Sequence, residues 1–489
     1  MVLPPNDAAE LRALVGDAGV LTSDAARFAY EADALTLAKH PPDAVVLPRS
    51  TEEVSAVVRW ANAKGLSITP RGAGTGLAGG STTEQGGLSL SLNRMDRVLR
   101  VDEQRLFAWV QPGLVNLWLS QTLAPVRLYF APDPASQQVS TIGGNVSTNA
   151  GGPHCLKYGV TFNHVLGATV VLADGSAVTL GGEALDAPGM DLLSVVSGSE
   201  GTCAIVTEIC VRLLPVPEGV KTMLFDFMTI EDACRTVSRV IATGIVPAAM
   251  EIMDRHTTEL VEAWLHMGLP TDAAALLLIE VDGPLVTLDA QAERIAAIAR
   301  EQHARSTRIA QDADERALLW KGRKSAFGAY GRTASGFTIM DGVVPRTRLA
   351  EALANVYAFA AEKGLQAGNV FHAGDGNLHP HVLFDATSAQ QQHDAIEVSH
   401  RILRMCIEYG GTISGEHGVG IEKRSMMAEL FAADDLAIME RVRAAFDPER
   451  RLNPGKILPG GAGCGEAHAH AFSALRGYAA NANAEGPWI

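Results

Sequence analysis

Residues Arg71-Gly-Ala-Gly-Thr-Gly-Leu-Ala-Gly-Gly80 decide the fold of this chain. Five of these ten residues are glycine, and a short β-type run, Ser67-Ile-Thr69, leads into them. Residues 74–79 match the GxGxxG spacing of dinucleotide-binding loops, and Asp96 follows at about the 20-residue distance that this fingerprint expects. The fingerprint also needs a helix directly after the glycines, whereas residues 80–87 (GSTTEQGG) have the composition of a loop. We therefore expect a loop of exposed backbone N–H groups that can wrap a pyrophosphate, and no Rossmann fold.

A second polar, glycine-rich stretch covers residues 132–152 (PDPASQQVSTIGGNVSTNAGG). Small side chains and glycines of this kind let the backbone come close to a large, flat, polar ligand. A purely structural loop of this length would be unusual inside a compact domain. Together with residues 199–206 (SEGTCAIV), the stretch predicts a buried cofactor.

The segments around these loops alternate between strand and helix patterns. Ser50-Thr-Glu-Glu53 forms a capping box, which predicts a helix with Val54, Val57, Val58 and Ala61 on one face. Further strands are expected at 45–47, 67–69, 88–92, 106–110, 165–172 and 205–214. Beyond Pro215 and Pro217 the pattern predicts an α+β domain on an antiparallel sheet. Its expected strands are 221–227, 248–253 and 275–281, and its expected helices are 230–243, 286–303, 312–330, 347–363 and 388–409.

The bulk composition excludes several classes of protein. With 489 residues the chain should divide into two or three domains. The net charge of −15 argues against a nucleic-acid partner. The six cysteines have no CxxC or ferredoxin spacing, which indicates reduced thiols and no iron–sulfur cluster on this chain. The start of the chain lacks a signal-peptide pattern, and no run of 18 apolar residues predicts a membrane span.

Two histidine motifs near the C-terminus indicate a metal site. They are His372-Ala-Gly-Asp-Gly-Asn-Leu-His379-Pro-His381 and Ser414-Gly-Glu416-His417-Gly-Val-Gly420. Asp375-Gly376 favours a two-residue hairpin turn, which would pair His372 with His379 and place His381 on the same face. Glu416 would supply a third ligand and leave open positions of the kind that catalytic metals keep. These residues predict a metal-assisted enzyme.

The motifs resemble a known family of flavoproteins. The loop 71–80 and the segments 132–152 and 199–206 resemble the FAD-binding domain of the vanillyl-alcohol-oxidase/para-cresol-methylhydroxylase superfamily, and Leu452-Asn-Pro-Gly-Lys456 resembles the strand end that returns to the flavin. The metal motifs and Trp320-Lys-Gly-Arg-Lys324 narrow the resemblance to FAD-linked D-2-hydroxy-acid dehydrogenases, nearest to the flavin (D) subunits of glycolate oxidase. The implied fold class is α+β, with a two-subdomain FAD-binding domain and an α+β substrate (cap) domain with an antiparallel sheet.

This resemblance also implies a domain plan and a cofactor site. The expected domains are an N-terminal helical lead-in (1–40), the FAD-binding domain (41–217), the cap domain with the metal site (218–440), the C-terminal return to the flavin (441–460) and a loose tail (461–489). FAD should bind without a covalent bond, because residues 70–81 contain no histidine. The expected cofactor-binding residues are Arg71, Gly72, Ala73, Gly74, Thr75, Gly76, Leu77, Pro132, Asp133, Ser136, Thr141, Gly143, Gly144, Asn145, Ser147, Asn149, Gly151, Glu200, Gly201, Ile205 and Asn453.

The implied reaction is hydride transfer from the α-carbon of a 2-hydroxy acid to flavin N5. A divalent metal on His372, His379 and Glu416 would polarise the hydroxyl; Zn²⁺ fits this ligand set best, with Mn²⁺, Fe²⁺ and Co²⁺ as alternatives. His417 is the expected general base, and Arg323 the expected fork for the carboxylate, with Lys324 or Arg424 as weaker candidates. We expect Asn377 and His381 either to contact substrate or to hydrogen-bond the metal ligands, and we assign His154 only a place in the flavin pocket. Cys464, His468 and His470 in the tail match no standard metal spacing.

The expected substrate is glycolate or D-lactate. Related 2-hydroxyglutarate dehydrogenases carry a lysine just before the aspartate that corresponds to Asp341, and an asparagine where this chain has His381. Here Ile339 and Met340 precede Asp341, so a second carboxylate would lack a cation. The expected electron acceptors are a second flavin-domain subunit and an iron–sulfur subunit. Alternatives are a stand-alone D-lactate dehydrogenase that uses cytochrome or quinone, a D-2-hydroxyglutarate dehydrogenase, and a non-catalytic flavin scaffold. The expected location is cytoplasmic, with peripheral attachment to the inner membrane face as the alternative.

Overall fold

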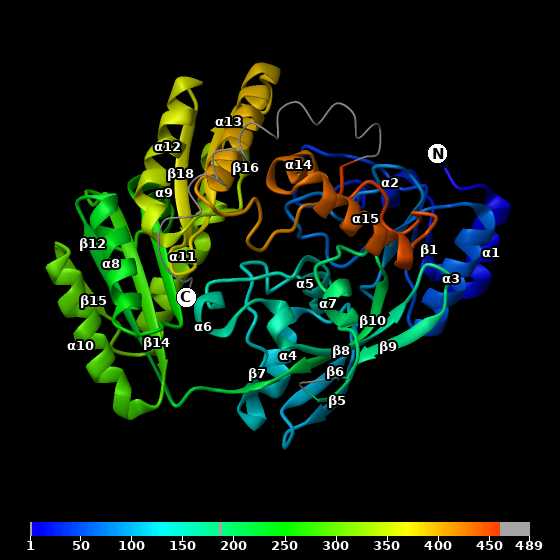
Figure 1. Cartoon of the computed structure of the whole chain (residues 1–489), viewed down its shortest axis with the longest axis horizontal. Coiled ribbons are helices and arrows are strands. Elements are labelled where there is room, and N and C mark those ends of the chain that lie inside the picture. Colours follow the sequence, from blue (N-terminus) through cyan, green and yellow to red (C-terminus); the bar gives the residue numbers. More distant parts are fainter. Residues whose placement is uncertain (1, 185–187, 460–489) are drawn as a thin grey trace.

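The computed structural model describes residues 2–184 and 188–459. The predicted tail, with Cys464, His468 and His470, lies outside the described residues. Figure 1 shows one large sheet with its helices on one side of the molecule and two smaller sheets on the other. None of the helices in the described ranges combines the length and apolar character that a membrane span needs.

The first small sheet carries the glycine loop. Its strand order is β1-β2-β4-β3, with β2, β4 and β3 parallel and β1 antiparallel to β2. The strands are β1 (Val20–Leu21), β2 (Ala44–Val46), β3 (Ile68–Arg71) and β4 (Leu88–Ser91). The accompanying helices are α1 (Pro5–Val15), α2 (Asp24–Phe28) and α3 (Thr51–Lys64). Ser50 caps α3 by accepting a hydrogen bond from the Glu53 backbone N–H, as the capping box predicts.

The second small sheet is antiparallel and has the order β5-β6-β10-β8-β9. Its strands are β5 (Val98–Asp102), β6 (Phe107–Val110), β8 (Val165–Val171), β9 (Ala177–Gly181) and β10 (Ile205–Arg212). Short elements connect it: α4 (Asn116–Leu123), β7 (Leu128–Tyr129), α5 (Ile142–Thr148), α6 (Cys155–Tyr158), α7 (Leu192–Val196) and β11 (Leu214–Pro215). The glycine-rich segment 132–152 runs from β7 into α5 and past its C-terminal end.

The nine-stranded sheet has the order β15-β12-β14-β13-β18-β19-β17, and β20 pairs with both β18 and β16. Its strands are β12 (Gly219–Phe227), β13 (Ala249–Asp254), β14 (Ala275–Gly283), β15 (Ser306–Ile309), β16 (Gly336–Ile339), β17 (Gly342–Val343), β18 (Gln366–His372), β19 (Asn377–Leu378) and β20 (Pro380–Phe384). All the pairs are antiparallel, as the sequence predicts for this half of the chain.

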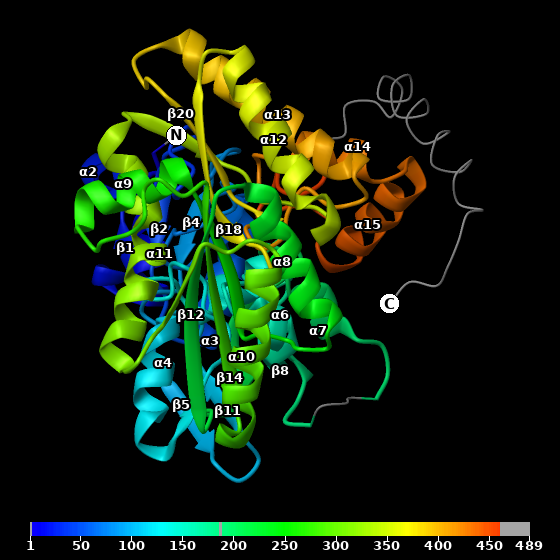
Figure 2. The same cartoon turned by 90° about the vertical axis from the view of Figure 1, so that its left-hand side faces the viewer.

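Helices cover both faces of the nine-stranded sheet. Figure 2 shows α8 and α10 on one side of the sheet and α9 and α11 on the other. The helices are α8 (Ile230–Ala242), α9 (Arg255–Leu265), α10 (Leu285–Glu301), α11 (Ala313–Thr333), α12 (Leu349–Glu362), α13 (Ala389–Glu408), α14 (Met427–Leu430) and α15 (Ala433–Phe446). Alternate residues of β12 supply the two cores: Met223, Phe225 and Phe227 pack toward α8 and α10, and Leu224 packs toward α11. The predicted α+β architecture with an antiparallel sheet is confirmed, although α9 was not predicted.

Candidate active site

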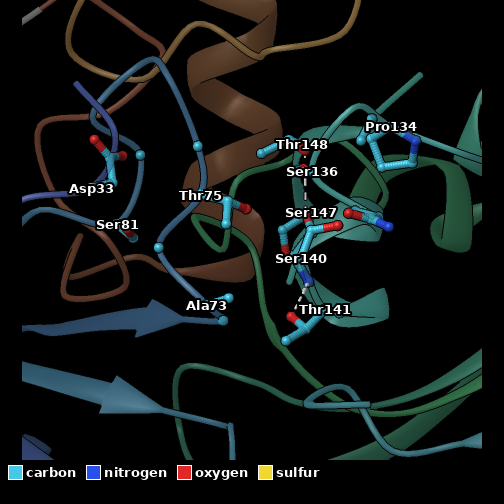
Figure 3. Close-up of a pocket in the computed structure, with 18 of the residues that line it drawn as sticks. Asp33, Ala73, Thr75, Ser81, Pro134, Ser136, Ser140, Thr141, Ser147 and Thr148 are labelled. Atoms are coloured by element: carbon cyan, nitrogen blue, oxygen red, sulfur yellow. Dashed lines mark hydrogen bonds between the residues drawn. The ribbon is translucent and has the colours of Figure 1, made fainter. Parts of the chain in front are cut away.

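A cavity of about 560 Å³ lies between the two glycine-rich segments. In Figure 3, Asp33, Ala73, Thr75 and Ser81 lie on one side of it and the labelled residues between Pro134 and Thr148 on the other. This volume is in the range of cofactor and ligand sites in enzymes. The two glycine-rich stretches, residues 71–80 and 132–152, are far apart in the sequence but form the walls of one pocket.

Most of the predicted cofactor-binding residues line this cavity. They are Arg71, Gly72, Ala73, Gly74, Thr75, Gly76, Leu77, Ser136, Thr141, Gly143, Gly144, Asn145, Ser147, Glu200, Gly201 and Ile205. The other predicted residues do not line it: Pro132, Asp133, Asn149, Gly151 and Asn453. The Pro132 carbonyl accepts a hydrogen bond from Asn116 at 3.0 Å, and the Asn149 amide oxygen accepts one from the Phe162 backbone N–H at 2.9 Å.

Asp33 is a wall residue that the sequence motifs did not indicate. It lies in the predicted N-terminal lead-in (1–40), and burial raises the pKa of its carboxyl group. Arg71 lies nearby, is buried, and donates to the Ala32 carbonyl at 2.9 Å, which ties the glycine loop to this segment. Gly74 has a φ of +73°, and a Cβ there would lie 2.1 Å from Arg71 Nη2. The left-handed conformation favours glycine here, and a larger residue would also displace the Arg71 guanidinium.

Unpaired polar groups in the wall fit a polar cofactor such as FAD. Asn145 Nδ2 and Ser140 Oγ are buried and have no hydrogen-bond partner among the described residues, although both residues line the cavity. Buried polar groups of this kind are normally satisfied, so a ligand with its own polar atoms is the expected partner. The wall chemistry agrees with the predicted FAD site.

The C-terminal return braces the glycine loop. Asn453 is fully buried and its side-chain amide donates to the Gly80 carbonyl at 2.8 Å and the Glu200 carbonyl at 2.6 Å. Lys456 Nζ, also fully buried, donates to the Thr82 carbonyl at 2.8 Å. Asn453 thus contacts the backbone of two segments that line the cavity and does not line the cavity itself.

The three predicted metal ligands converge on one point. Glu416 Oε1 lies 3.2 Å from His372 Nε2 and 3.3 Å from His379 Nε2, and the three donor atoms all lie within 4.8 Å of one another. A zinc ion ~2.0–2.1 Å from each donor would hold its tetrahedral ligands about 3.3 Å apart, so the spacing fits one ion. His379 Nε2 is buried and has no hydrogen-bond partner in the described part of the chain, which suits a ligand atom.

The register of the histidine hairpin differs from the predicted one. His372 pairs with Asn377, and Asn369 with Pro380, so the turn contains residues 373–376 and not the two residues Asp375 and Gly376 alone. Asp375 Oδ1 accepts a hydrogen bond from the Asn377 backbone N–H and shapes this longer turn. The prediction of a direct His372–His379 pair is therefore wrong. Because the shift is from residue 379 to residue 377, an even number, every side chain keeps its face, and the His372 and His379 rings still lie 4.9 Å apart.

Two buried carboxylates hold the loop that carries Glu416 and His417. Asp341 accepts hydrogen bonds from Ser414 Oγ at 2.7 Å and from the His417 backbone N–H at 2.8 Å. Glu200, from the opposite domain, accepts from the Val419 and Gly420 backbone N–H groups at 2.7 and 2.9 Å. Burial alone would raise the pKa of Asp341, but neighbouring basic groups, among them the buried Lys423 ammonium 3.2 Å away, hold it well below the usual range. The anchoring role of Asp341 was not predicted, since its partners are distant in sequence.

The other two histidines are kept neutral. Burial lowers the pKa of His417 to about 4, and its ring stacks on His379 with centroids 5.0 Å apart. His417 lines the large cavity, and its Nδ1 has no hydrogen-bond partner within residues 2–184 and 188–459. Burial likewise lowers the pKa of His381 to about 3, where the ring stacks on Tyr330 at 4.2 Å. A neutral imidazole at the cavity edge can accept a proton.

The three residues predicted to bind the substrate carboxylate lie in three different surroundings. Lys324 lines the large cavity, next to Phe327. Arg323 lies behind it, only 8% exposed, with Nε bonded to Glu251 Oε2 at 2.6 Å. Arg424 is not brought to this site, because its guanidinium forms a bidentate pair with Glu84 at 2.8 and 2.9 Å.

Asn377 and His154 lie away from the large cavity. Asn377 lines a smaller cavity of about 150 Å³ on the other side of Glu416, together with Gly151 and Cys155. A Cβ on Gly151 would lie 2.9 Å from Glu416 Oε2, so glycine allows the two domains to approach here. His154 lies at the domain interface, between Asp133 Oδ2 at 2.8 Å and Glu280 Oε1 at 3.3 Å.

With this geometry established, comparisons with known proteins identify the family. Residues 42–181 match the family described as FAD binding domain, and residues 216–457 match FAD linked oxidases, C-terminal domain. The chain is 42% identical over 449 residues to the glycolate oxidase subunit GlcD of Escherichia coli strain K12, covering 92% of this chain and 90% of that protein. The chain belongs to the FAD-linked oxidase family. This FAD-linked oxidase is also 33% identical over 428 residues to a D-lactate dehydrogenase of Anaerostipes hadrus, covering 86% of this chain and 90% of that protein.

The fold of the FAD-linked oxidase matches solved flavoprotein structures. The structure of p-cresol methylhydroxylase superposes with a TM-score of 0.79 at 18% identity, covering 92% of this chain and 96% of that chain. The predicted fold class and the predicted resemblance to glycolate oxidase flavin subunits are confirmed. The protein is a flavin-dependent oxidoreductase with FAD as its cofactor.

Proposed function

We propose that this chain oxidises a small D-2-hydroxy acid, glycolate or D-lactate, to the 2-oxo acid, with a divalent metal at His372, His379 and Glu416. One observation carries this proposal: Glu416 and His417 line the same cavity as the glycine loop. The metal triad, a neutral imidazole and the cofactor pocket therefore meet at one place. The names of the relatives, glycolate oxidase subunit and D-lactate dehydrogenase, support the same substrate class.

The residues divide the chemistry as follows. FAD, when bound, supplies the acceptor for the hydride from the substrate α-carbon, and the metal supplies the charge that polarises the substrate hydroxyl. His417 takes the proton of that hydroxyl, since its imidazole is neutral near pH 7 and faces the cavity. Lys324 pairs with the substrate carboxylate from α11, and Arg323 supports it from behind. Removal of the proton and transfer of the hydride together leave the 2-oxo acid.

The site chemistry favours a monocarboxylate. Met340, fully buried, precedes Asp341, and His381 is neutral, so neither position offers a cation for a second carboxylate. Burying an unpaired carboxylate is costly. We therefore propose D-2-hydroxyglutarate as a poorer substrate than glycolate or D-lactate.

We infer that electrons leave this chain through separate subunits. The Escherichia coli relative is named as a subunit of glycolate oxidase, which supports partner subunits for this chain. The partners that we propose are a second flavin-domain chain and an iron–sulfur chain, in the cytoplasm or at the inner membrane face. The second candidate is a stand-alone D-lactate dehydrogenase that reduces cytochrome or quinone. The relative named D-lactate dehydrogenase favours it.

Anaerobic reduction of the bound flavin tests the proposal. The metal-loaded protein is mixed with glycolate, D-lactate or D-2-hydroxyglutarate, and the oxidised flavin band is followed with time. Glycolate or D-lactate should bleach it fastest, and treatment with a chelator should slow the bleaching. If none of the three acids bleaches the flavin, the dehydrogenase proposal is wrong.

A further inference from the structure

One buried carboxylate touches both the metal triad and helix α11. Glu251, on the central strand β13, has a side chain with 0% exposure. Its Oε2 accepts a hydrogen bond from Arg323 Nε at 2.6 Å, and its Oε1 lies 2.7 Å from His372 Nδ1. Both contacts are short enough to be charge-assisted hydrogen bonds. No sequence motif indicated this residue.

The sheet register explains why Glu251 reaches His372. The two residues are direct partners across the antiparallel strands β13 and β18. Directly opposite side chains on one face have Cβ atoms about 4.5–5.5 Å apart, so the carboxylate meets the imidazole without backbone strain. The same face of the sheet packs against α11, which supplies Arg323.

This contact fixes the chemistry of His372. When Nδ1–H donates to Glu251, the lone pair of the neutral ring lies on Nε2, the atom that faces Glu416. Glu251 is not itself a ligand or base for the cavity, because both of its oxygens are engaged and its side chain is inaccessible. Its effect must act through the two groups that it holds.

We propose that Glu251 is a positioning residue that couples the metal site to the carboxylate-binding helix. The proposal rests on the proposed function. One carboxylate sets the ring orientation of His372 and, through Arg323, the position of the α11 segment from which the adjacent Lys324 lines the cavity. Metal affinity and substrate affinity should therefore weaken together when the bridge is broken from either end.

Glu280 provides a matched control. Its side chain is 2% exposed on the neighbouring strand β14, and it also bonds to α11, through Arg316 Nη2 at 2.7 Å and Trp320 Nε1 at 2.7 Å. It contacts none of the three proposed metal ligands among its hydrogen bonds in the described structure. Replacing either glutamate by glutamine thus removes a buried charge that pairs with the same helix, but only one variant breaks the link to His372.

The experiment measures Zn²⁺ affinity by chelator competition on FAD-loaded, metal-stripped protein, with KM, kcat and the thermal midpoint in parallel. Glu251→Gln should weaken Zn²⁺ binding about 10–100-fold, as loss of a partner of a metal-bound histidine does, and should raise KM. Arg323→Gln, the second variant, should also weaken Zn²⁺ binding although Arg323 touches no proposed ligand. Glu280→Gln should keep the wild-type Zn²⁺ affinity while losing thermal stability.

Three outcomes would contradict the positioning role of Glu251. Wild-type Zn²⁺ affinity in Glu251→Gln, or an equal loss in Glu280→Gln, would overturn the positioning role while leaving the proposed function intact. If Glu251→Gln does not fold, Arg323→Gln alone carries the test, and unchanged Zn²⁺ affinity there rejects the coupling. If the wild-type protein itself binds no Zn²⁺ and no substrate bleaches its flavin, the proposed function fails together with this inference.

Discussion

At the scale of single residues, the proposed base His417 is held in place by its backbone and not by its imidazole ring. The backbone N–H of His417 donates to Asp341 at 2.8 Å, whereas its ring nitrogens lie 4.0 Å from the Asp341 carboxylate and 3.8 Å from that of Glu416, too far for hydrogen bonds. The ring also stacks on His379. Glu416, its neighbour, is held in the same way by the Asp341 carboxylate. The ring of His417 can therefore be removed without releasing the loop that carries the metal ligand.

This arrangement gives a sharp expectation for His417→Ala. The variant should bind FAD and metal as the wild type does, but the rate of anaerobic flavin reduction by substrate should fall about 10²–10⁴-fold, since that is the usual contribution of a general base. Stopped-flow absorbance of the flavin band measures the rate. His393→Ala, on the exposed side of α13, serves as the control and should reduce normally. A wild-type rate in His417→Ala would remove the base assignment.

At the scale of elements, the hairpin between β18 and β19 sets the spacing of the two histidine ligands. Gly376 closes its turn with a φ of +84°, and a Cβ there would lie 2.1 Å from the Val344 carbonyl oxygen. The obstacle is backbone, which cannot rotate away as a side chain can. The turn geometry, and with it the positions of His372 and His379, therefore depends on this one glycine.

We expect Gly376→Ala to displace the hairpin. The left-handed conformation alone costs about 1–2 kcal/mol for a residue with a Cβ, and the contact with Val344 adds to it. Gly364→Ala is the matched control, because Gly364 has a φ of +66° with nothing within 4 Å of a Cβ. The urea midpoint and the Zn²⁺ affinity should both fall more in Gly376→Ala than in the control. Equal losses in the two variants would contradict a role for the turn in the metal site.

Features with a local sequence signal could be predicted, whereas features that depend on contacts distant in sequence could not. Glycine-rich composition and the histidine motifs are local signals, so the cofactor walls at 71–77 and 136–147 and the ligand cluster could be predicted. The hairpin register was predicted wrongly because the competing four-residue turn depends on the close approach of Val344, which lies outside the motif. Glu251 and Asp341 had no local signal, since their partners lie 72 and 76 residues away in sequence. Their roles follow only from the assembled sheet.

At the scale of the whole molecule, charged pairs join the FAD-binding domain to the cap. His154 bridges Asp133 and Glu280, and Tyr158 Oη donates to Asp282 at 2.6 Å. Burial alone would lower the pKa of His154, but the two carboxylates raise it to about 10. The imidazolium therefore stays charged at neutral pH and links the two domains.

Stability should depend on pH through this bridge. The pKa of His154 is about 10 in the folded protein, above the value of ~6.5 in the unfolded chain. The contribution of protonated His154 to the stability of the fold is thus complete below pH ~6.5 and is lost as the pH rises toward 10. The free energy of unfolding of His154→Gln, measured with urea, should be about 2 kcal/mol below that of the wild type at pH 6. At pH 10 the two should differ little. A pH-independent difference would contradict the bridge, and His393→Gln serves as the control.

The contact of Asn453 with the glycine loop also sets the order of events when the chain is made. Asn453 meets Gly80 across 373 residues, and the Arg451 carbonyl accepts from the Ile68 backbone N–H on β3 at 2.9 Å. Figure 1 shows the red C-terminal segment beside the blue elements of the first sheet. A ribosome therefore completes the whole cap before the brace for the cofactor loop emerges. The complete set of contacts that holds the glycine loop can therefore form only after the cap has been synthesised.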